Sequence, residues 1–246
     1  MQKKDFYLFH FKGFAAPQVE EEPQKGCGCD SAVLKRYVSS FITGLIAGTT
    51  GEAYMLYYNN NFNLKGFKSP AYLNGCIITG VQQVSKDISK TILRKSPYFA
   101  ELSVKNPLLF GAATGLPMWT LTRLVATPLQ NSRKKEKKPF DGLFTSIVND
   151  VGYHTVKNGL DEYFGARVYP KILPKIPCFA FQKLTEATIA GAIGGVSYIL
   201  AFPYKGPVAG QSFSEAVKLM IGMAPKTGIK KLTCTLARPK VTKLIS

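Results

Sequence analysis

The sequence has few acidic residues, very little histidine and few cysteines. Against 32 lysines and arginines stand 15 aspartates and glutamates, two histidines and five cysteines in 246 residues. Neither His10 nor His154 has metal-ligand spacing, and an odd, scattered set of cysteines is not a disulfide framework. The pattern leaves open whether Cys27 and Cys29 are free thiols or a redox or metal pair. No phosphate loop, nucleophile elbow or paired carboxylate site is present, so we expect no enzyme, metal site or cofactor.

The shortage of acid gives a net charge of +17, for which two explanations are open. One is nucleic-acid binding, in which lysine and arginine neutralise phosphates. The other is a membrane protein whose basic loops face anionic headgroups. Long apolar stretches favour the second explanation, and no recognition-helix, zinc-finger or RNA-binding motif supports the first. We therefore expect membrane lipids and no nucleic acid as partners, with cardiolipin as a possible bound lipid.

Three stretches are long and almost free of charge. Residues 37–58 contain one charge, Glu52; residues 107–129 contain one, Arg123; residues 187–204 contain none. About 20 apolar residues in a helix cross the roughly 30 Å of a bilayer core. A fourth stretch, 71–93, becomes polar after Val81, and the sequence leaves open whether it, or the proline-rich segment 165–184, spans the membrane. The expected fold class is an all-α, multi-pass membrane protein.

Small residues recur at spacing four within the apolar stretches. The pairs are Gly44 and Gly48, Gly111 and Gly115, and Gly191 and Gly195. Such pairs let two helices approach closely, so we expect helix-packing glycines at these positions. The isolated charges Glu52 and Arg123 are costly in lipid and are expected to serve a function or face a partner. They either pair with each other or reach a membrane interface separately.

Two further segments have helical periodicity with polar residues between the apolar ones. Residues 140–157 and 213–223 are predicted to be amphipathic helices on the membrane surface. The last two thirds of the chain contain the same order of parts twice: an apolar span ending in proline, an amphipathic helix, a glycine and a basic stretch. Pro128 and Pro203 lie 75 residues apart in this repeat, and Gly159 and Gly228 lie 69 apart.

This order resembles the mitochondrial carrier family, whose odd-numbered spans end in Pro-x-acid-x-x-base-x-base, often followed by glutamine. The corresponding positions are Pro128, Gln130, Arg133 and Lys135 in one copy, and Pro203, Lys205 and Gln211 in the next. The resemblance implies a degenerate mitochondrial-carrier-like repeat fold with transmembrane helices and matrix-side amphipathic helices, in the mitochondrial inner membrane. Its parts are a polar extension (1–34), repeat 1 without its matrix helix (35–106), repeat 2 (107–184) and repeat 3 with a truncated sixth helix (185–246).

The chain departs from the family pattern where transport depends on it. The signature acids, which in the family form the gate salt bridges, are replaced by Gln130 and Lys205, and the third copy has Val208 and Gly210 in place of its bases. The sixth segment, 236–246, is too short to cross a bilayer. We therefore expect a gate that does not close and no sealed six-helix barrel from this chain alone.

These departures predict a non-transporting structural accessory subunit of a respiratory-chain complex of the mitochondrial inner membrane, with cytochrome c oxidase as the first candidate. Its partners would be the other subunits of that complex, and the polar extension would be ordered only against a neighbour. One alternative is a mitochondrial solute carrier that binds an anion through Arg167, Lys171 and Lys175. Another is a protein-import channel component of the glycine-rich four-span type.

Overall fold

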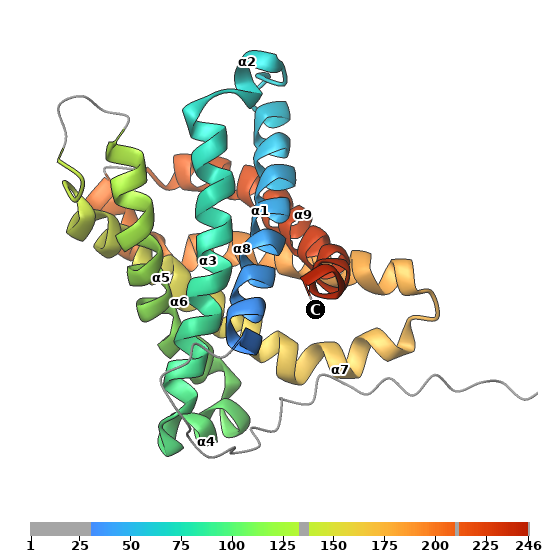
Figure 1. Ribbon diagram of the computed structural model, residues 1–246. Helices are drawn as coiled ribbons and strands as arrows, with labels where there is room; N and C mark the ends of the chain where they lie inside the picture. Colours follow the sequence, from blue (N-terminus) through green and yellow to red (C-terminus); the bar gives the residue numbers. More distant parts are fainter. Residues whose placement is uncertain (1–30, 133–137, 210–211, 246) are drawn as a thin grey trace, which may run out of the picture.

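The computed structural model describes residues 31–132, 138–209 and 212–245, and all regular structure in these ranges is helical (Figure 1). The helices are α1 (Ser31–Tyr58), α2 (Leu64–Phe67), α3 (Pro70–Arg94), α4 (Pro97–Lys105), α5 (Pro107–Asn131), α6 (Leu143–Tyr163), α7 (Tyr169–Ile172), α8 (Phe179–Ala209) and α9 (Phe213–Ile245). The all-helical prediction is confirmed for this part of the chain. Residues 1–30 of the polar extension, with Cys27 and Cys29, lie outside the described residues.

Local sequence explains where several helices begin. Ser69 and Asn106 each accept a hydrogen bond from the backbone N–H three residues on, at 3.2 Å, and a proline follows each of them. Proline suits the first helical position, because the N–H that it lacks would have no partner there. At the start of α9, Ser212 and Glu215 bond reciprocally as a capping box. The backbone N–H of Ser212 holds the pKa of the Glu215 carboxyl below its ordinary value.

Six long helices form three hairpins, α1–α3, α5–α6 and α8–α9. Each long helix contacts the next in the order α1, α3, α5, α6, α8, α9, and α9 packs against α1, so the order closes into a ring. In Figure 1 α1 and α3 stand upright, and α9 crosses α1 at a steep angle. The six helices thus close into a ring of contacts, while the expectation that the chain does not form a sealed six-helix barrel stays a prediction.

The last third of the chain differs from its predicted structure, and this difference supplies the sixth helix of the ring. Residues 213–223 and 236–246 were expected to be a surface helix and a truncated sixth span, but one helix of 33 residues, α9, runs through Pro225 and Pro239 to Ile245. The predicted truncation is wrong. Residues 140–157 likewise do not form a separate surface helix, because they belong largely to α6, which packs between α5 and α8.

Proline explains the irregular segment between α6 and α8. A π-helical turn (Phe164–Val168) leads into α7, and a 3-10 turn (Leu173–Lys175) follows it. Pro170 and Pro174 lack the N–H groups that a continuous α-helix would need at these positions. Segment 71–93, by contrast, lies within the single helix α3. Between α1 and α3 the chain forms only the four-residue α2.

The six predicted packing glycines all lie where the two helices of a hairpin meet. A Cβ atom added to Gly44 or Gly48 would lie 2.7–2.8 Å from the backbone of Gly80 or Cys76 in α3, and one added to Gly115 would lie 2.6 Å from Cα of Thr155 in α6. Gly111 meets Asn158 of α6 in the same way, and Gly191 and Gly195 meet α9 at Ala224 and Met220. Real Cβ atoms do not approach backbone atoms this closely, so five of the six positions need glycine; at Gly195 the nearest atom is 3.1 Å away and belongs to the flexible Met220 side chain.

The second helix of each hairpin also contributes glycine to the crossing. Gly80 of α3, Gly159 of α6 and Gly228 of α9 lie against Phe41, Leu108 and Ala187 of their partner helices. Each hairpin therefore has a glycine pair on its first helix and at least one glycine on its second, and Gly75 of α3 and Gly194 of α8 add further close contacts.

Large apolar side chains lie mainly outside the ring and small polar ones inside it. The largest fully buried side chains are Phe110, Thr43, Thr114, Thr122, Ser89 and Ser197. On the outer faces, Leu109, Leu116, Leu124 and Val125 of α5 and Val196 and Leu200 of α8 are 43–58% exposed. Two stretches, Pro107–Asn131 and Phe179–Pro203, are long and apolar enough to cross a membrane. Both observations favour membrane association.

Candidate functional site

Charged side chains from five of the six long helices form one set of ion pairs, which we call the interior network. Its members are Glu52, Lys86, Lys90, Lys157, Asp161, Glu162, Lys183, Glu186, Lys226, Lys230 and Lys231. Except for Lys231, these side chains are only 11–22% exposed. Charges so far from water need partners, and each of these side chains has at least one.

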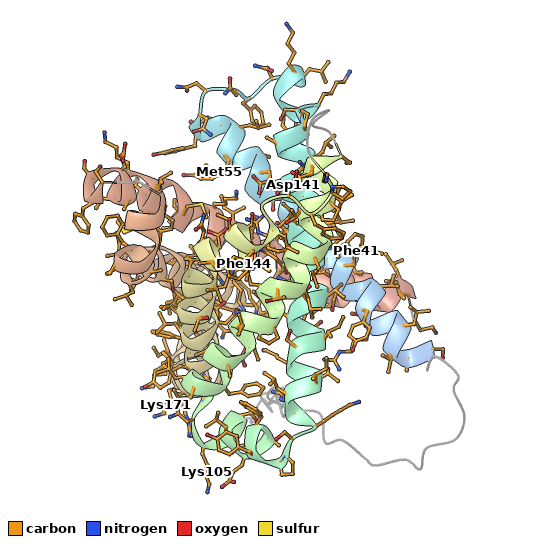
Figure 2. The ribbon with its side chains drawn as sticks, turned by 90° about the vertical axis from the view of Figure 1, so that its left-hand side faces the viewer. Phe41, Met55, Lys105, Asp141, Phe144 and Lys171 are labelled. Atoms are coloured by element: carbon orange, nitrogen blue, oxygen red, sulfur yellow. The ribbon has the colours of Figure 1, made fainter. Side chains whose placement is uncertain are left out.

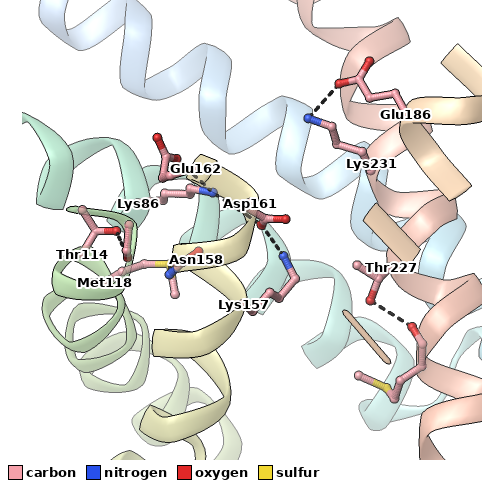
Figure 3. A network of polar contacts seen from close by, with 12 residues as sticks. Lys86, Thr114, Met118, Lys157, Asn158, Asp161, Glu162, Glu186, Thr227 and Lys231 are labelled. Atoms are coloured by element: carbon pink, nitrogen blue, oxygen red, sulfur yellow. Dashed lines mark hydrogen bonds and ion pairs between the residues drawn. The ribbon is translucent and has the colours of Figure 1, made fainter. Parts of the chain in front are cut away.

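Part of the network joins the first hairpin to the second. The Lys86 ammonium of α3 lies 3.8 Å from the Asp161 carboxylate and 3.9 Å from that of Glu162, both on α6. Lys90 pairs with Glu162. Lys157 lies 2.6 Å from Asp161, as Figure 3 shows. In the ring order α5 separates α3 from α6, so these contacts connect helices that are not neighbours.

The lysines of α9 join the third hairpin to the first. Lys226 and Lys230 lie 2.9 Å and 3.3 Å from the Glu52 carboxylate of α1. Lys230 also donates a hydrogen bond to the Thr79 hydroxyl of α3, at 2.7 Å. One carboxylate thus pairs with two lysines at the place where α1 and α9 meet.

Glu186 of α8 completes the network. It accepts from Lys231 of α9 at 2.9 Å and from Lys183 of its own helix at 3.2 Å, and Figure 3 shows the first of these contacts. Lys231 also acts electrostatically on Asp161 of α6. The network therefore connects all three hairpins across the ring.

Hydroxyl pairs support the contact between the first and last helices, which we call the α1–α9 seam. The side-chain oxygens of Ser39 and Thr242 lie 3.0 Å apart, as do those of Thr50 and Thr233. Together with the ion pair of Glu52 and Lys226, these contacts extend from Ser39 to Glu52, about half the length of α1. The seam closes the ring.

Arg123 and Glu52 do not pair with each other, so that suggested pairing is wrong. The Arg123 guanidinium lies 2.9 Å from the Asp150 carboxylate of α6 and 4.6 Å from the centre of the Trp119 ring. It also donates to Gln130 at 3.3 Å. Each of the two isolated charges thus finds its opposite charge on a neighbouring helix, because α6 and α9 are long helices with charged inner faces.

The carrier-signature positions contribute little to the network. Pro128 and Gln130 lie in the last turns of α5, and Pro203 is an exposed residue of α8. Lys205 falls within α8, and Arg133, Lys135 and Gln211 lie outside the described residues. In the described part of this region, Asn131 makes the clearest contacts, because its side-chain amide donates to the backbone carbonyls of Lys138, Pro139 and Asp141 at 2.9–3.1 Å.

The three basic residues suggested as solute contacts lie in the segment between α6 and α8, outside the interior network. Arg167 donates to the backbone carbonyl of Val104 at 2.9 Å, and Lys171 shares with Arg167 an open hollow of about 370 Å³. Figure 2 shows Lys171 and Lys105 at the same end of the molecule. Lys175 follows in the 3-10 turn.

Histidine and cysteine take part in packing. The His154 ring stacks on Trp119 with the ring centres 3.8 Å apart. Cys76 is buried, Cys234 is half-buried and Cys178 is exposed, and all three are free thiols. No group of three or more metal-ligating side chains occurs in residues 31–132, 138–209 and 212–245.

Sequence reasoning missed most of the interior network. The sequence analysis singles out Glu52, but it does not single out Asp161, Glu162, Lys230 or Lys231. One signal was available: Lys226 and Lys230 are four residues apart, as are Lys86 and Lys90, and this spacing places each pair on one face of a helix. Four lysines on two such faces indicate that a carboxylate-bearing partner lies opposite.

No protein-family model, no curated protein and no solved structure matches this chain. The protein is therefore classified by its structure alone. It is a ring of three helical hairpins, the helices of each hairpin cross at glycines, and ion pairs connect the hairpins inside the ring.

Proposed function

We propose that the chain is a non-transporting structural subunit of a membrane protein complex, in which it fills space and holds other subunits. The observation that carries the proposal is the interior network. Its lysines and carboxylates contact one another across the ring, where a transporter would need a path for its solute. Opening such a path would separate several mostly buried ion pairs at once, and each charge that stayed buried without its partner would cost several kcal/mol.

In its specific form, the proposal places the chain in the mitochondrial inner membrane, as an accessory subunit of a respiratory complex built on a degenerate carrier-like repeat. Cytochrome c oxidase is the first candidate. Three hairpins with the same glycine arrangement, and prolines near the ends of α5 and α8, support the carrier-like repeat. The loss of both signature acids, at Gln130 and Lys205, supports a role without transport.

The apolar outer faces define how such a subunit would bind its neighbours. The large residues of α5 and α8 point away from the ring and are free to contact lipid or other membrane helices. The charges of the interior network are paired within the chain, so a partner that meets the outer faces of α5 and α8 does not need to supply a charge to them.

A mitochondrial solute carrier is the second candidate, and one observation favours it. Among the described residues, seven lysines of the network face four carboxylates, which leaves a surplus of three positive charges inside the ring. Such a surplus would attract an anion. A four-span import channel component is less well supported, because the described chain has six long helices instead of four.

Blue-native electrophoresis of membranes solubilised in mild detergent, blotted for this chain, tests the proposal. We expect the chain to migrate within a large complex and, in the specific form of the proposal, to follow oxidase activity. The matched control is an aliquot denatured with dodecyl sulfate, in which the chain should migrate as a 27.0 kDa polypeptide. Migration as a lone monomer in mild detergent, together with specific anion uptake by reconstituted liposomes, would contradict the proposal and support the carrier.

A further inference from the structure

A hollow of about 350 Å³ lies beside the α1–α9 seam. The first turns of α1, the last turns of α9 and one residue of α3, Asp87, form its walls. Its lining includes two buried hydroxyls: Ser39 meets the exposed Thr242, and Ser40 donates to the half-buried Asp87 carboxylate. This hollow is separate from the interior network, whose residues do not line it.

Three cations surround the opening of the hollow. Lys35 and Arg36 come from α1 and Arg238 from α9, and all three residues are exposed. Asp87 is the acidic residue that the hollow contains, so its lining has a formal charge of +2. Two guanidinium groups, which can each donate two parallel hydrogen bonds, are well suited to a phosphate group.

Exposed apolar side chains occur in the same turns of α1 and α9 as the hollow, together with the exposed Lys240 and Lys243. Val33, Leu34 and Val38 of α1 are 39–54% exposed, and Leu236 and Leu244 of α9 are 49% and 86% exposed. Ile245 lines the hollow itself. A ligand that fits both features has a phosphate for the cations and long apolar chains for the exposed leucines and valines.

We propose that this hollow binds the headgroup of an anionic phospholipid, whose phosphate lies between Arg36 and Arg238 while its acyl chains lie on the outer faces of α1 and α9. The inference rests on the membrane embedding in the proposed function, but not on membership of a complex. The bound lipid connects α1 with α9, because Arg36 and Arg238, its two principal contacts, come from these two helices. Its location at the seam would make it a stabiliser of ring closure.

Native mass spectrometry of the detergent-purified full chain tests the site. The delipidated protein is titrated with phosphatidylglycerol, phosphatidylcholine or water-soluble glycerol phosphate. We expect phosphatidylglycerol to bind, and the double variant Arg36→Gln/Arg238→Gln to weaken its binding about fivefold for each cation removed. The matched control, Lys65→Gln/Lys68→Gln, removes two exposed positive charges at α2, at the other end of α1, and should change binding less than twofold.

The conservative variant Arg36→Lys/Arg238→Lys keeps both charges and should retain binding. Equal binding of phosphatidylglycerol by the wild type and the glutamine variant would overturn the site, as would equal binding of phosphatidylcholine. Full competition by glycerol phosphate would show a site for free phosphate compounds instead of a lipid. A chain that stays soluble without detergent would contradict the membrane embedding itself, which distinguishes that failure from a failure of the site alone.

Discussion

Replacing Glu52 by alanine should lower the free energy of unfolding by about 3 kcal/mol or more, the range for removing one partner of a buried ion pair. The Glu52 side chain is 14% exposed and lies between Lys226 and Lys230, which are 15% and 22% exposed. Without the carboxylate, two mostly buried ammonium groups on one face of α9 repel each other. Because these contacts belong to the α1–α9 seam, the loss should loosen the first and last helices.

Thermal or denaturant unfolding of the purified chain in detergent measures this effect. The control is Glu101→Ala, which breaks the ion pair with Lys105, whose two side chains are 59% and 75% exposed. An exposed pair contributes about 0–1 kcal/mol, so the control should unfold close to the wild type. A Glu52→Ala variant as stable as the control would show that Glu52 is not paired inside the ring.

Replacing Gly115 by alanine should cost about 1–3 kcal/mol, the range for overpacking a close contact. A Cβ at this position would lie 2.6 Å from Cα and 2.8 Å from N of Thr155, and backbone atoms of a packed helix cannot yield as a flexible side chain can. The α5–α6 crossing must widen to accept the methyl group. The contacts of Trp119, one turn further along α5, widen with it.

Trp119, the single tryptophan, reports on this crossing. Its ring is 4% exposed, stacks on His154, and donates through Nε1 to the Ser146 carbonyl at 3.3 Å. We expect its fluorescence emission to shift to the red and the unfolding midpoint to fall. The matched control is Gly165→Ala, where no atom lies within 4 Å of the added Cβ, and which should leave both unchanged or raise stability slightly. Equal behaviour of the two variants would contradict the close crossing.

The sequence was sufficient to predict the helices that contain long apolar stretches and glycine pairs. The stretches 37–58, 71–93, 107–129 and 187–204 all lie within long helices, and the three glycine pairs lie at helix contacts. These predictions depend on local properties, hydropathy and residue size, that do not need the partner helix to be known. The beginnings of α3 and α5 are equally local, since Ser69-Pro70 and Asn106-Pro107 supply both cap and first turn.

The partner of each charge could not be predicted in the same way. Lys226, Lys230 and Lys231 make α9 polar, so hydropathy ends the helix after Met223 and treats the rest as a basic tail. In the structure these lysines pair with Glu52 of α1 and Glu186 of α8, which lie far away along the chain. The pairing of Arg123 with Asp150, and not with Glu52, is likewise a property of the packed hairpins.

The closed ring is the basis of both proposals, because the interior network and the lipid hollow each need α1 beside α9. A pair of cysteines introduced by Ser39→Cys and Thr242→Cys tests it most directly, since the two native hydroxyls already meet at 3.0 Å. Under mild oxidation in intact membranes, peptide mapping should find most of the chain linked between positions 39 and 242, and neither single variant should give that link. If the double variant gives no such link while a maleimide labels both positions, α1 and α9 do not meet and the ring is open.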